Sequence, residues 1–158
     1  MKKLIPFIAL LFLVNCSTSA QKKESKKKYA VNKTNTEWKK ELNPMQYYVL
    51  REAGTERAFS SPLNKTEEKG IYVCAACKTE LYNAMHKFDS KSGWPSFDRA
   101  IEGNVALDVD YKIGYARTEL KCNTCGGHLG HSFNDGPKTT GKRHCINGVA
   151  LEFIPEEK

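Results

Sequence analysis

Residues 122–133 read Cys122-Asn123-Thr124-Cys125-Gly126-Gly127-His128-Leu129-Gly130-His131-Ser132-Phe133. A similar Cys-x-x-Cys turn, Cys74-Ala75-Ala76-Cys77, occurs earlier, and 44 residues separate the two pairs. Each pair can place two thiolates on one metal ion, and two pairs complete the tetrahedral sulfur site that zinc prefers. Because four thiolates leave no open position, we predict one structural zinc ion (Zn2+) bound by Cys74, Cys77, Cys122 and Cys125. The same four ligands also suit iron.

These cysteines have a competing interpretation. The chain has six cysteines, which form disulfides in an oxidising compartment, and a single Cys-x-x-Cys can be a redox pair. Two pairs of equal spacing, with no strand–helix–strand pattern around either, favour the metal. The gap between them is longer than in a compact zinc ribbon, so the metal is expected to tie distant strands together.

Short runs of β-branched and aromatic residues dominate the chain after Gly70. They predict strands at residues 71–74, 105–110, 113–122 and 144–153. No long period of 3.6 residues and no alternation of strands with helices occurs there, which weighs against a doubly wound sheet. We therefore predict one mainly β domain with antiparallel sheets.

Two short helices are predicted before these strands. The first covers residues 36–42 and is opened by Thr36. Asn43 then supplies an N-cap and Pro44 the first helical position of a second helix, which runs through residues 45–53 and stops at Gly54.

Cys145 stands apart from the four paired cysteines. It follows Arg143 and His144 and precedes Asn147, so nearby cations and an amide could favour a reactive thiolate. The alternative is a small buried hydrophobic side chain.

The two histidines and one tryptophan also have two interpretations each. Four thiolates saturate the metal, which leaves His128 and His131 for acid–base work or for a structural role in a hydrogen-bonded loop. Trp94 lies between Gly93 and Pro95, where it can form the wall of an apolar pocket or belong to the core.

Taken together, these segments resemble the methionine sulfoxide reductase B family, which acts on the R epimer at sulfur. The resemblance runs from about Leu42 to Phe153. It includes the helical start, both Cys-x-x-Cys pairs and three further motifs: residues 93–97 (Gly-Trp-Pro-Ser-Phe), 127–133 (Gly-His-Leu-Gly-His-Ser-Phe) and 143–147 (Arg-His-Cys-Ile-Asn). It implies two antiparallel sheets with short N-terminal helices and a four-cysteine zinc site at one side, a β-tent-like fold.

The resemblance also implies the site. Cys145 is expected to be the nucleophile, with His128, His131 and Asn147 polarising and protonating the sulfoxide oxygen. Trp94 is expected to hold the methyl group of the substrate, and Arg143 and Phe133 to line the same site. Attack by the thiolate would release methionine and leave a sulfenic acid on Cys145.

One position departs from many members of the family. They carry a resolving cysteine just before the Gly-Trp-Pro motif, where this chain has Ser92. The expected partners are therefore an oxidised protein or peptide as substrate, and a small thiol or thioredoxin-like protein as reductant, unless Cys16 is free to help.

The net charge of +7 lies at the beginning of the chain. Residues 1–36 hold eight lysines and Glu24, which leaves 17 basic and 17 acidic residues in the remainder. One alternative function is a zinc-ribbon-like module that recruits protein or nucleic acid. A neutral domain weighs against nucleic acid as the partner. A disulfide oxidoreductase is the other alternative, and its cysteines would react with alkylating reagents before any metal is removed.

The first residues predict export. Residues 1–20 have the charged start and short apolar run of a signal peptide, with cleavage before Cys16, as in a lipoprotein, or near Ala20. Asn15 fits the lipoprotein pattern poorly. Residues 21–36 are predicted to be a flexible lysine-rich linker and 37–158 the catalytic domain. The expected location is the periplasm or cell envelope, with membrane attachment only through a lipid on Cys16.

Overall fold

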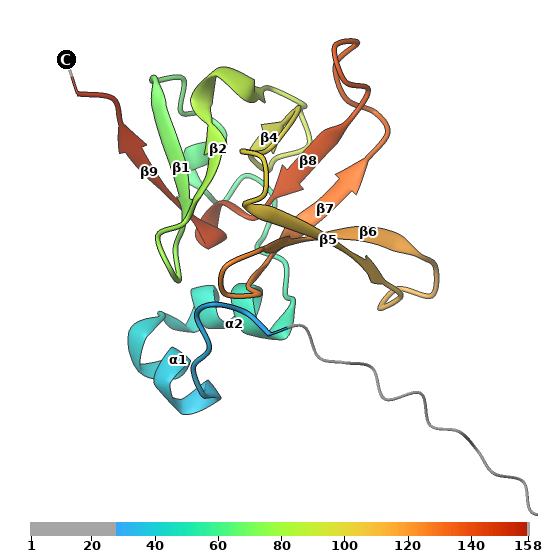
Figure 1. The fold of residues 1–158 in the computed structure, drawn as a ribbon. Coiled ribbons are helices and arrows are strands. Elements are labelled where there is room, and N and C mark those ends of the chain that lie inside the picture. Colours follow the sequence, from blue (N-terminus) through green and yellow to red (C-terminus); the bar gives the residue numbers. More distant parts are fainter. Residues whose placement is uncertain (1–27, 158) are drawn as a thin grey trace, which may run out of the picture.

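The computed structural model describes residues 28–157 and consists of two antiparallel sheets above two short helices (Figure 1). The smaller sheet has the strand order β2-β1-β9, made of Glu80–Asn83, Gly70–Cys74 and Leu151–Pro155. The larger sheet has the order β3-β4-β8-β7-β6-β5. Its strands are β3 Lys87–Phe88, β4 Ser96–Phe97, β8 Arg143–Ile146, β7 His128–Phe133, β6 Arg117–Cys122 and β5 Val105–Asp110. The predicted mainly β fold with two antiparallel sheets is confirmed.

The helices begin at side-chain caps. Helix α1, Asn35–Glu41, starts after Thr34, whose hydroxyl and Glu37 form a reciprocal capping box, so the predicted opening at Thr36 was wrong. Helix α2, Pro44–Glu52, starts after Asn43 as predicted and ends at Ala53, which adopts a left-handed conformation.

Several strand boundaries differ from the predictions. The predicted run 144–153 forms two strands, β8 and β9, because the single turn η3 (Gly148–Ala150) carries the chain from one sheet to the other. The predicted run 113–122 begins only at Arg117, since the preceding residues form the turn between β5 and β6. Strands β2, β3, β4 and β7 were not predicted, nor were the turns η1 (Pro62–Asn64) and η2 (Ala84–His86).

The N-terminal predictions lie partly outside the described residues. The predicted signal peptide, its two alternative cleavage sites and the predicted lipid anchor at Cys16 fall within residues 1–27, outside the described residues. The described part of the predicted linker belongs to the fold, because the Val31 N–H donates to Thr124 O at 2.9 Å and Asn35 already lies in α1. Within residues 28–157, no helix is both long enough and apolar enough to cross a bilayer.

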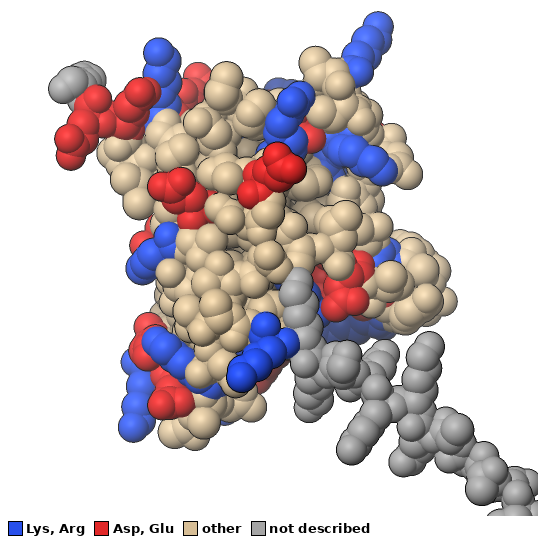
Figure 2. Space-filling model, in the orientation of Figure 1, with Lys and Arg blue, Asp and Glu red and all other residues tan. Residues whose placement is uncertain are grey.

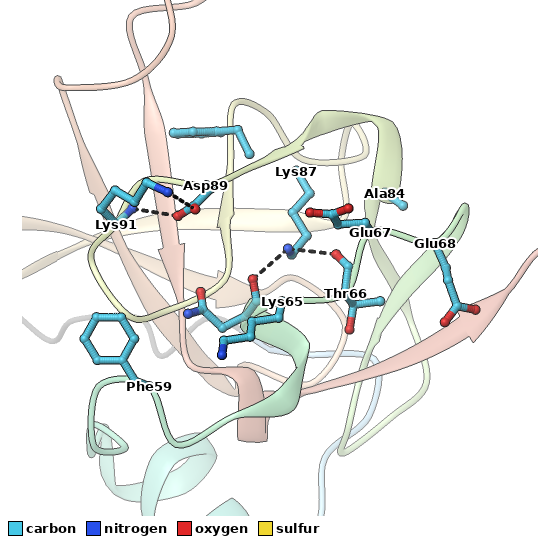
Figure 3. Close-up of a pocket in the computed structure, with 11 residues that line it drawn as sticks. Phe59, Lys65, Thr66, Glu67, Glu68, Ala84, Lys87, Asp89 and Lys91 are labelled. Carbon is cyan, nitrogen blue, oxygen red and sulfur yellow. Dashed lines mark hydrogen bonds and ion pairs between the residues drawn. The ribbon is translucent and has the colours of Figure 1, made fainter.

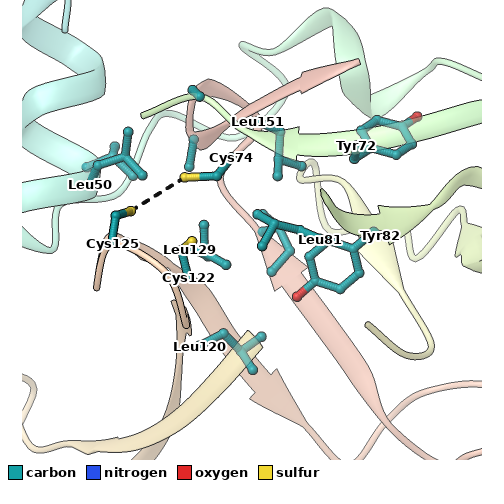
Figure 4. Packing of buried hydrophobic residues seen from close by; sticks show 14 of the residues in the cluster. Leu50, Tyr72, Cys74, Leu81, Tyr82, Leu120, Cys122, Cys125, Leu129 and Leu151 are labelled. Carbon is teal, nitrogen blue, oxygen red and sulfur yellow. Dashed lines mark hydrogen bonds between the residues drawn. The ribbon is translucent and has the colours of Figure 1, made fainter. Parts of the chain in front are cut away.

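The core lies between the two sheets and the helices. The Tyr82 ring stacks on Phe97 with centroids 4.3 Å apart, and Tyr72 meets Phe97 edge-on at 5.0 Å. Leu50 of α2 packs near the cysteines, so the core and the predicted metal site are continuous (Figure 4). Burial of these large side chains joins the two sheets into one domain.

Candidate active site and metal centre

The four paired cysteines meet where the two sheets approach each other. Each pair occupies the same kind of turn, in which the N–H four residues after the first cysteine donates to its carbonyl at 2.8 Å. The residue at that fourth position, Lys78 or Gly126, adopts a left-handed conformation. Because the first pair begins at the last residue of β1 and the second at the last residue of β6, the cluster links one sheet to the other.

The geometry of the cluster fits a tetrahedral ion. All four Sγ atoms lie within 4.8 Å of one another, with Cys74–Cys125 at 3.8 Å and Cys77–Cys122 at 3.5 Å. Sulfurs bound at about 2.3 Å to a tetrahedral zinc lie about 3.8 Å apart. Cys74, Cys122 and Cys125 are buried, and none of the four forms a disulfide. A structural metal site is therefore supported, and zinc fits its donor set.

Strand β7 begins shortly after the second cysteine pair. Its close approach to β8 requires a glycine at position 130. A Cβ atom at Gly130 would lie only 1.9 Å from the carbonyl oxygen of Cys145 on β8. In the β6–β7 pairing, Leu120 is opposite Gly130 but Lys121 is opposite His128, so Leu129 is an extra residue. This bulge brings His128 and His131, which would face opposite sides of a regular strand, to ring centroids 5.2 Å apart.

The strand register places Cys145 in a row of polar side chains. Cys145 is opposite Ser96 of β4 on one side and opposite His131 of β7 on the other. His131 is in turn opposite Glu119 of β6. Directly paired residues share a face of a sheet, so the thiol and the imidazole lie on the same face of neighbouring strands.

Each histidine is backed by a carboxylate. His128 Nδ1 lies 2.7 Å from Glu119 Oε1, and His131 Nε2 lies 2.8 Å from Asp110 Oδ2. Burial lowers the pKa of His131, while the contact with Asp110 opposes that shift. A carboxylate behind an imidazole stabilises the imidazolium and leaves the other ring nitrogen to carry a proton toward a ligand. Both histidines therefore fit the role of proton donor.

The ionised Asp110 carboxylate is expected to make the free energy of unfolding depend on pH in the acid range. Its carboxylate accepts the Lys112 backbone N–H, contacts His131 and pairs with Arg117 at 2.5 Å, which together hold its pKa below the usual range. A lowered pKa contributes stability above the unfolded value near 4, and this stability is lost as the pH falls. We expect the free energy of unfolding to fall less steeply below pH 4 in Asp110→Asn than in wild type, measured by urea unfolding across pH.

The matched control for this prediction is Glu102→Gln, which changes an exposed carboxylate on the turn before β5. The loss of stability in Asp110→Asn relative to wild type is expected to be largest at pH 7 and smaller at pH 3. Equal losses at both pH values would contradict the role of the Asp110 charge.

The Cys145 thiol is partly buried and faces few charged groups. Burial raises its pKa, while the Arg143 guanidinium and the Ser92 hydroxyl act in the opposite direction. Ser92 Oγ lies 3.9 Å from Cys145 Sγ. Arg143 donates two hydrogen bonds to Asp135 at 2.9 and 2.8 Å and lies over the Phe133 ring at 4.6 Å, so Arg143 and Phe133 form one unit beside the thiol.

Asn147 and Trp94 are joined through Glu56. The Glu56 N–H donates to Asn147 Oδ1 at 2.9 Å, and the Glu56 carbonyl accepts the Trp94 indole N–H at 3.2 Å. Asn147 Nδ2 donates one hydrogen to Leu129 O at 3.0 Å, which fixes the amide and leaves its second hydrogen for a ligand. The Glu56 carboxylate accepts the backbone N–H groups of Gly148 and Val149, so it anchors the chain just after Cys145.

Two surface pockets flank the segment that carries Ser92. One is lined by residues 88–92, 135–137 and Arg143, next to Cys145. The other lies on the far side of the same segment, where Lys87 Nζ donates to Asn64 O and Thr66 O at 2.9 Å (Figure 3). None of the predicted catalytic or substrate-binding residues lines this second pocket. On the face shown in Figure 2, acidic and basic side chains are interspersed rather than gathered into one basic patch.

The structure thus brings most of the predicted site residues into one neighbourhood. Cys145, His131, Arg143 and Phe133 are linked through β7 and β8, and Asn147 and Trp94 through Glu56. The sequence did not indicate Glu56, Asp110 or Glu119. Their spacing carries no motif, and only the register of β5 and β6 and the packing of residue 56 against η3 bring them to the site.

Comparison with known proteins identifies relatives over most of the chain. The SelR domain matches residues 42–155, which include both the cysteine cluster and Cys145. The peptide methionine sulfoxide reductase MsrB of Leptospira interrogans is 52% identical over 129 residues, covering 81% of this chain and 98% of that protein. The proteins of the same name from Methanosarcina barkeri and Agrobacterium fabrum are 52% and 48% identical, covering 82% and 79% of this chain and 92% and 93% of their own lengths. Among solved structures, the Mis18 'Yippee-like' domain matches with a TM-score of 0.48 and 14% identity, covering 58% of this chain and all of that one.

Proposed function

Because this chain belongs to the SelR-domain family of peptide methionine sulfoxide reductases, which are oxidoreductases that repair oxidised proteins, we propose that it reduces the R epimer of methionine sulfoxide through Cys145. The observation that carries the proposal is the pairing of Cys145 with His131 on neighbouring strands, with Asp110 behind the imidazole. A thiol nucleophile and a proton donor on one face are the two groups that sulfoxide reduction requires.

The proposed chemistry begins with the sulfoxide oxygen. Sulfoxide sulfur is a weak electrophile until its oxygen receives a hydrogen bond or a proton. His131 or His128 supplies that proton, and the free hydrogen of Asn147 Nδ2 helps to hold the oxygen. The Cys145 thiolate then attacks the sulfur. The sulfur–oxygen bond of the substrate breaks, the protonated oxygen is transferred to Cys145 Sγ, and methionine leaves, so that Cys145 becomes a sulfenic acid.

Regeneration of Cys145 needs two electrons from outside the site. Two external thiols reduce the sulfenic acid to a thiol and water and become a disulfide. Ser92 stands at the usual position of the resolving cysteine, with its Oγ 3.9 Å from Cys145 Sγ, but it carries no thiol. We therefore propose a one-cysteine enzyme that a small thiol or a thioredoxin-like protein regenerates.

The proposed function is tested by turnover of separate R and S epimers of a methionine sulfoxide peptide with excess dithiothreitol. We expect the R epimer alone to be converted to methionine, detected by chromatography. A folded, metal-loaded sample that reduces neither epimer, or prefers S, would contradict the proposal.

Trp94→Ala is expected to lower kcat/KM for the R epimer by about 10- to 100-fold, the value of one lost apolar contact in a pocket. The proposed reason is that Trp94 holds the methyl group and so orients the sulfoxide for attack. Trp94→Phe keeps an apolar wall while losing the bond to Glu56 O, and we expect it to retain more activity than Trp94→Ala.

The control for this prediction is the melting temperature of both variants, since Trp94 is partly buried. An unchanged kcat/KM in folded Trp94→Ala would exclude Trp94 from substrate binding.

We also propose that the chain works outside the cytoplasm, on the basis of the leader at residues 1–20. Expressed in a bacterial host, the full chain is expected in the envelope fraction, and Cys16→Ser is expected to release it from the membrane. Fractionation followed by immunoblotting measures both. Cytoplasmic protein would contradict export, and a membrane-bound Cys16→Ser variant would contradict the lipid anchor.

A further inference from the structure

Three serine hydroxyls form a connected chain that ends at Cys145. Ser96 Oγ donates to Trp94 O at 3.2 Å, Ser90 Oγ lies 2.7 Å from Ser96 Oγ and 2.8 Å from Ser92 Oγ, and Ser92 Oγ lies 3.9 Å from Cys145 Sγ. Ser96 is almost fully buried and is directly opposite Cys145 in the sheet, so the strand pairing fixes the far end of the chain.

The direction of these hydrogen bonds follows from counting protons. Each hydroxyl has one hydrogen to donate. Ser96 donates its hydrogen to a carbonyl, so Ser90 must donate to Ser96. Ser92 must then donate to Ser90, and its lone pairs face the Cys145 thiol, which donates to Ser92 while it is protonated.

Loss of the thiol proton changes one bond in this chain. A thiolate accepts hydrogen bonds, so the Ser92 hydroxyl can turn from Ser90 to Cys145 Sγ. Ser90 still accepts a hydrogen bond, because the Ser92 backbone N–H points at Ser90 Oγ at 3.4 Å. This rotation of the Ser92 hydroxyl therefore stabilises the Cys145 thiolate, and Ser90 Oγ still accepts a hydrogen bond from the Ser92 backbone N–H.

Charged and titratable groups on the neighbouring elements also act on the pKa of the Cys145 thiol. Arg143 on β8 lowers the pKa of the thiol, but its guanidinium is paired with Asp135, which acts in the opposite direction. His131 on β7 is opposite the thiol, and burial lowers its pKa. Asp89 and Lys91 neutralise each other on the segment that carries Ser92. Arg143 is thus the main charge that favours the thiolate, and it is opposed by burial and, more weakly, by Asp135, so a hydroxyl donor adds to the effect of Arg143.

We propose that Ser92 is a catalytic hydroxyl donor to Cys145 Sγ, and that Ser90 and Ser96 hold it in that role. The inference rests on the proposed function of Cys145 as the nucleophile. Ser92 occupies the usual position of the resolving cysteine. It would favour the thiolate that attacks the sulfoxide, whereas a resolving cysteine would reduce the sulfenic acid afterwards.

The test is the pH dependence of alkylation of Cys145 by iodoacetamide in the full-length, metal-loaded protein, with the labelled site quantified by peptide mass spectrometry. In Ser92→Ala, we expect about 10-fold less thiolate at a fixed pH below the pKa, the effect of losing one hydrogen bond to a charged group. Ser92→Thr keeps the hydroxyl and is expected to restore the wild-type profile. Ser90→Ala is expected to shift the profile in the same direction by a smaller factor.

Ser60→Ala is the matched control, because Ser60 is exposed and its hydroxyl donates to Arg57 O and not to the chain of serines. A purely structural role of Ser92 would change the melting temperature or the alkylation rate at all pH values alike, without moving the midpoint. Identical midpoints in wild type, Ser92→Ala and Ser90→Ala would overturn the proposal. If Ser92→Ala does not fold, Ser90→Ala alone decides.

The activity of Cys145→Ser tests the proposed function, and the thiol titration of Ser92→Ala tests the role of Ser92 separately. Full reductase activity in Cys145→Ser would remove the nucleophile from the mechanism, although the thiol titration could still be measured. An unchanged titration of Ser92→Ala in an enzyme that depends on Cys145 would remove only the role of Ser92.

Discussion

The Cys145→Ser variant is expected to lose roughly 10³-fold or more in kcat/KM for the R epimer of a methionine sulfoxide peptide, as enzymes do when their nucleophile is removed. Serine keeps the shape of the site, but its hydroxyl has a much higher pKa than a thiol and supplies almost no anion at neutral pH. The measurement is methionine formation with excess dithiothreitol under the conditions used for wild type.

The variant is expected to remain folded, since Cys145 is only partly buried and lies outside the cysteine cluster. Equal melting temperature and metal content in wild type and Cys145→Ser provide the control. In wild type treated with one equivalent of substrate and no reductant, mass spectrometry is expected to find sulfenic acid on Cys145. A stable intramolecular disulfide that includes Cys145 would contradict the one-cysteine mechanism, and retained activity in Cys145→Ser would contradict the nucleophile.

The four-cysteine cluster could be predicted because its chemistry is carried by residue type and spacing. Two Cys-x-x-Cys pairs specify their own turns locally, whatever the strands between them do. Strand β5 could be predicted for a similar reason, since Val105, Leu107 and Val109 alternate with small or polar residues. These features depend on the sequence near them.

Strand β7 could not be predicted, because its sequence contradicts ordinary strand preferences. Gly130 and two histidines interrupt it, and glycine is depleted in strands. The tertiary structure overrides this preference: the missing side chain at Gly130 lets β7 approach β8, and the bulge at Leu129 brings the rings of both histidines together. The feature that makes β7 a poor strand by propensity is the one that builds the site.

The contacts between the two histidines and their carboxylates depend on how strands distant in sequence are aligned with one another. Asp110 reaches His131 across two strand pairings, and Glu119 reaches His128 only because β6 and β7 are shifted by the bulge. Glu56 lies in a loop, and its carboxylate contacts residues more than ninety positions away in sequence. No local pattern encodes these partners, so they appear only when the sheets are assembled.

Removal of the metal is expected to unfold the domain. The cluster connects the end of β1 to the β6–β7 turn, and Leu50 of α2 packs beside it (Figure 4). A structural zinc contributes about 10–16 kcal/mol of binding free energy, whereas a whole domain is stable by only about 5–15 kcal/mol. We therefore expect Cys122→Ala to bind little metal and to lose its cooperative melting transition, measured by elemental analysis and circular dichroism.

Cys145→Ser is the matched cysteine control and is expected to keep a full metal content. A strong chelator added to wild type is expected to have the same effect as Cys122→Ala, and added zinc should restore the fold. Iron in the same site would instead give a coloured protein with visible absorbance. A folded, metal-free protein with disulfides among these cysteines would contradict the metal site: the 3.8 Å between Cys74 and Cys125 would then have to close to a bond of about 2.05 Å. Such closure would pull the sulfurs away from the spacing that suits a tetrahedral ion, so the two outcomes exclude each other.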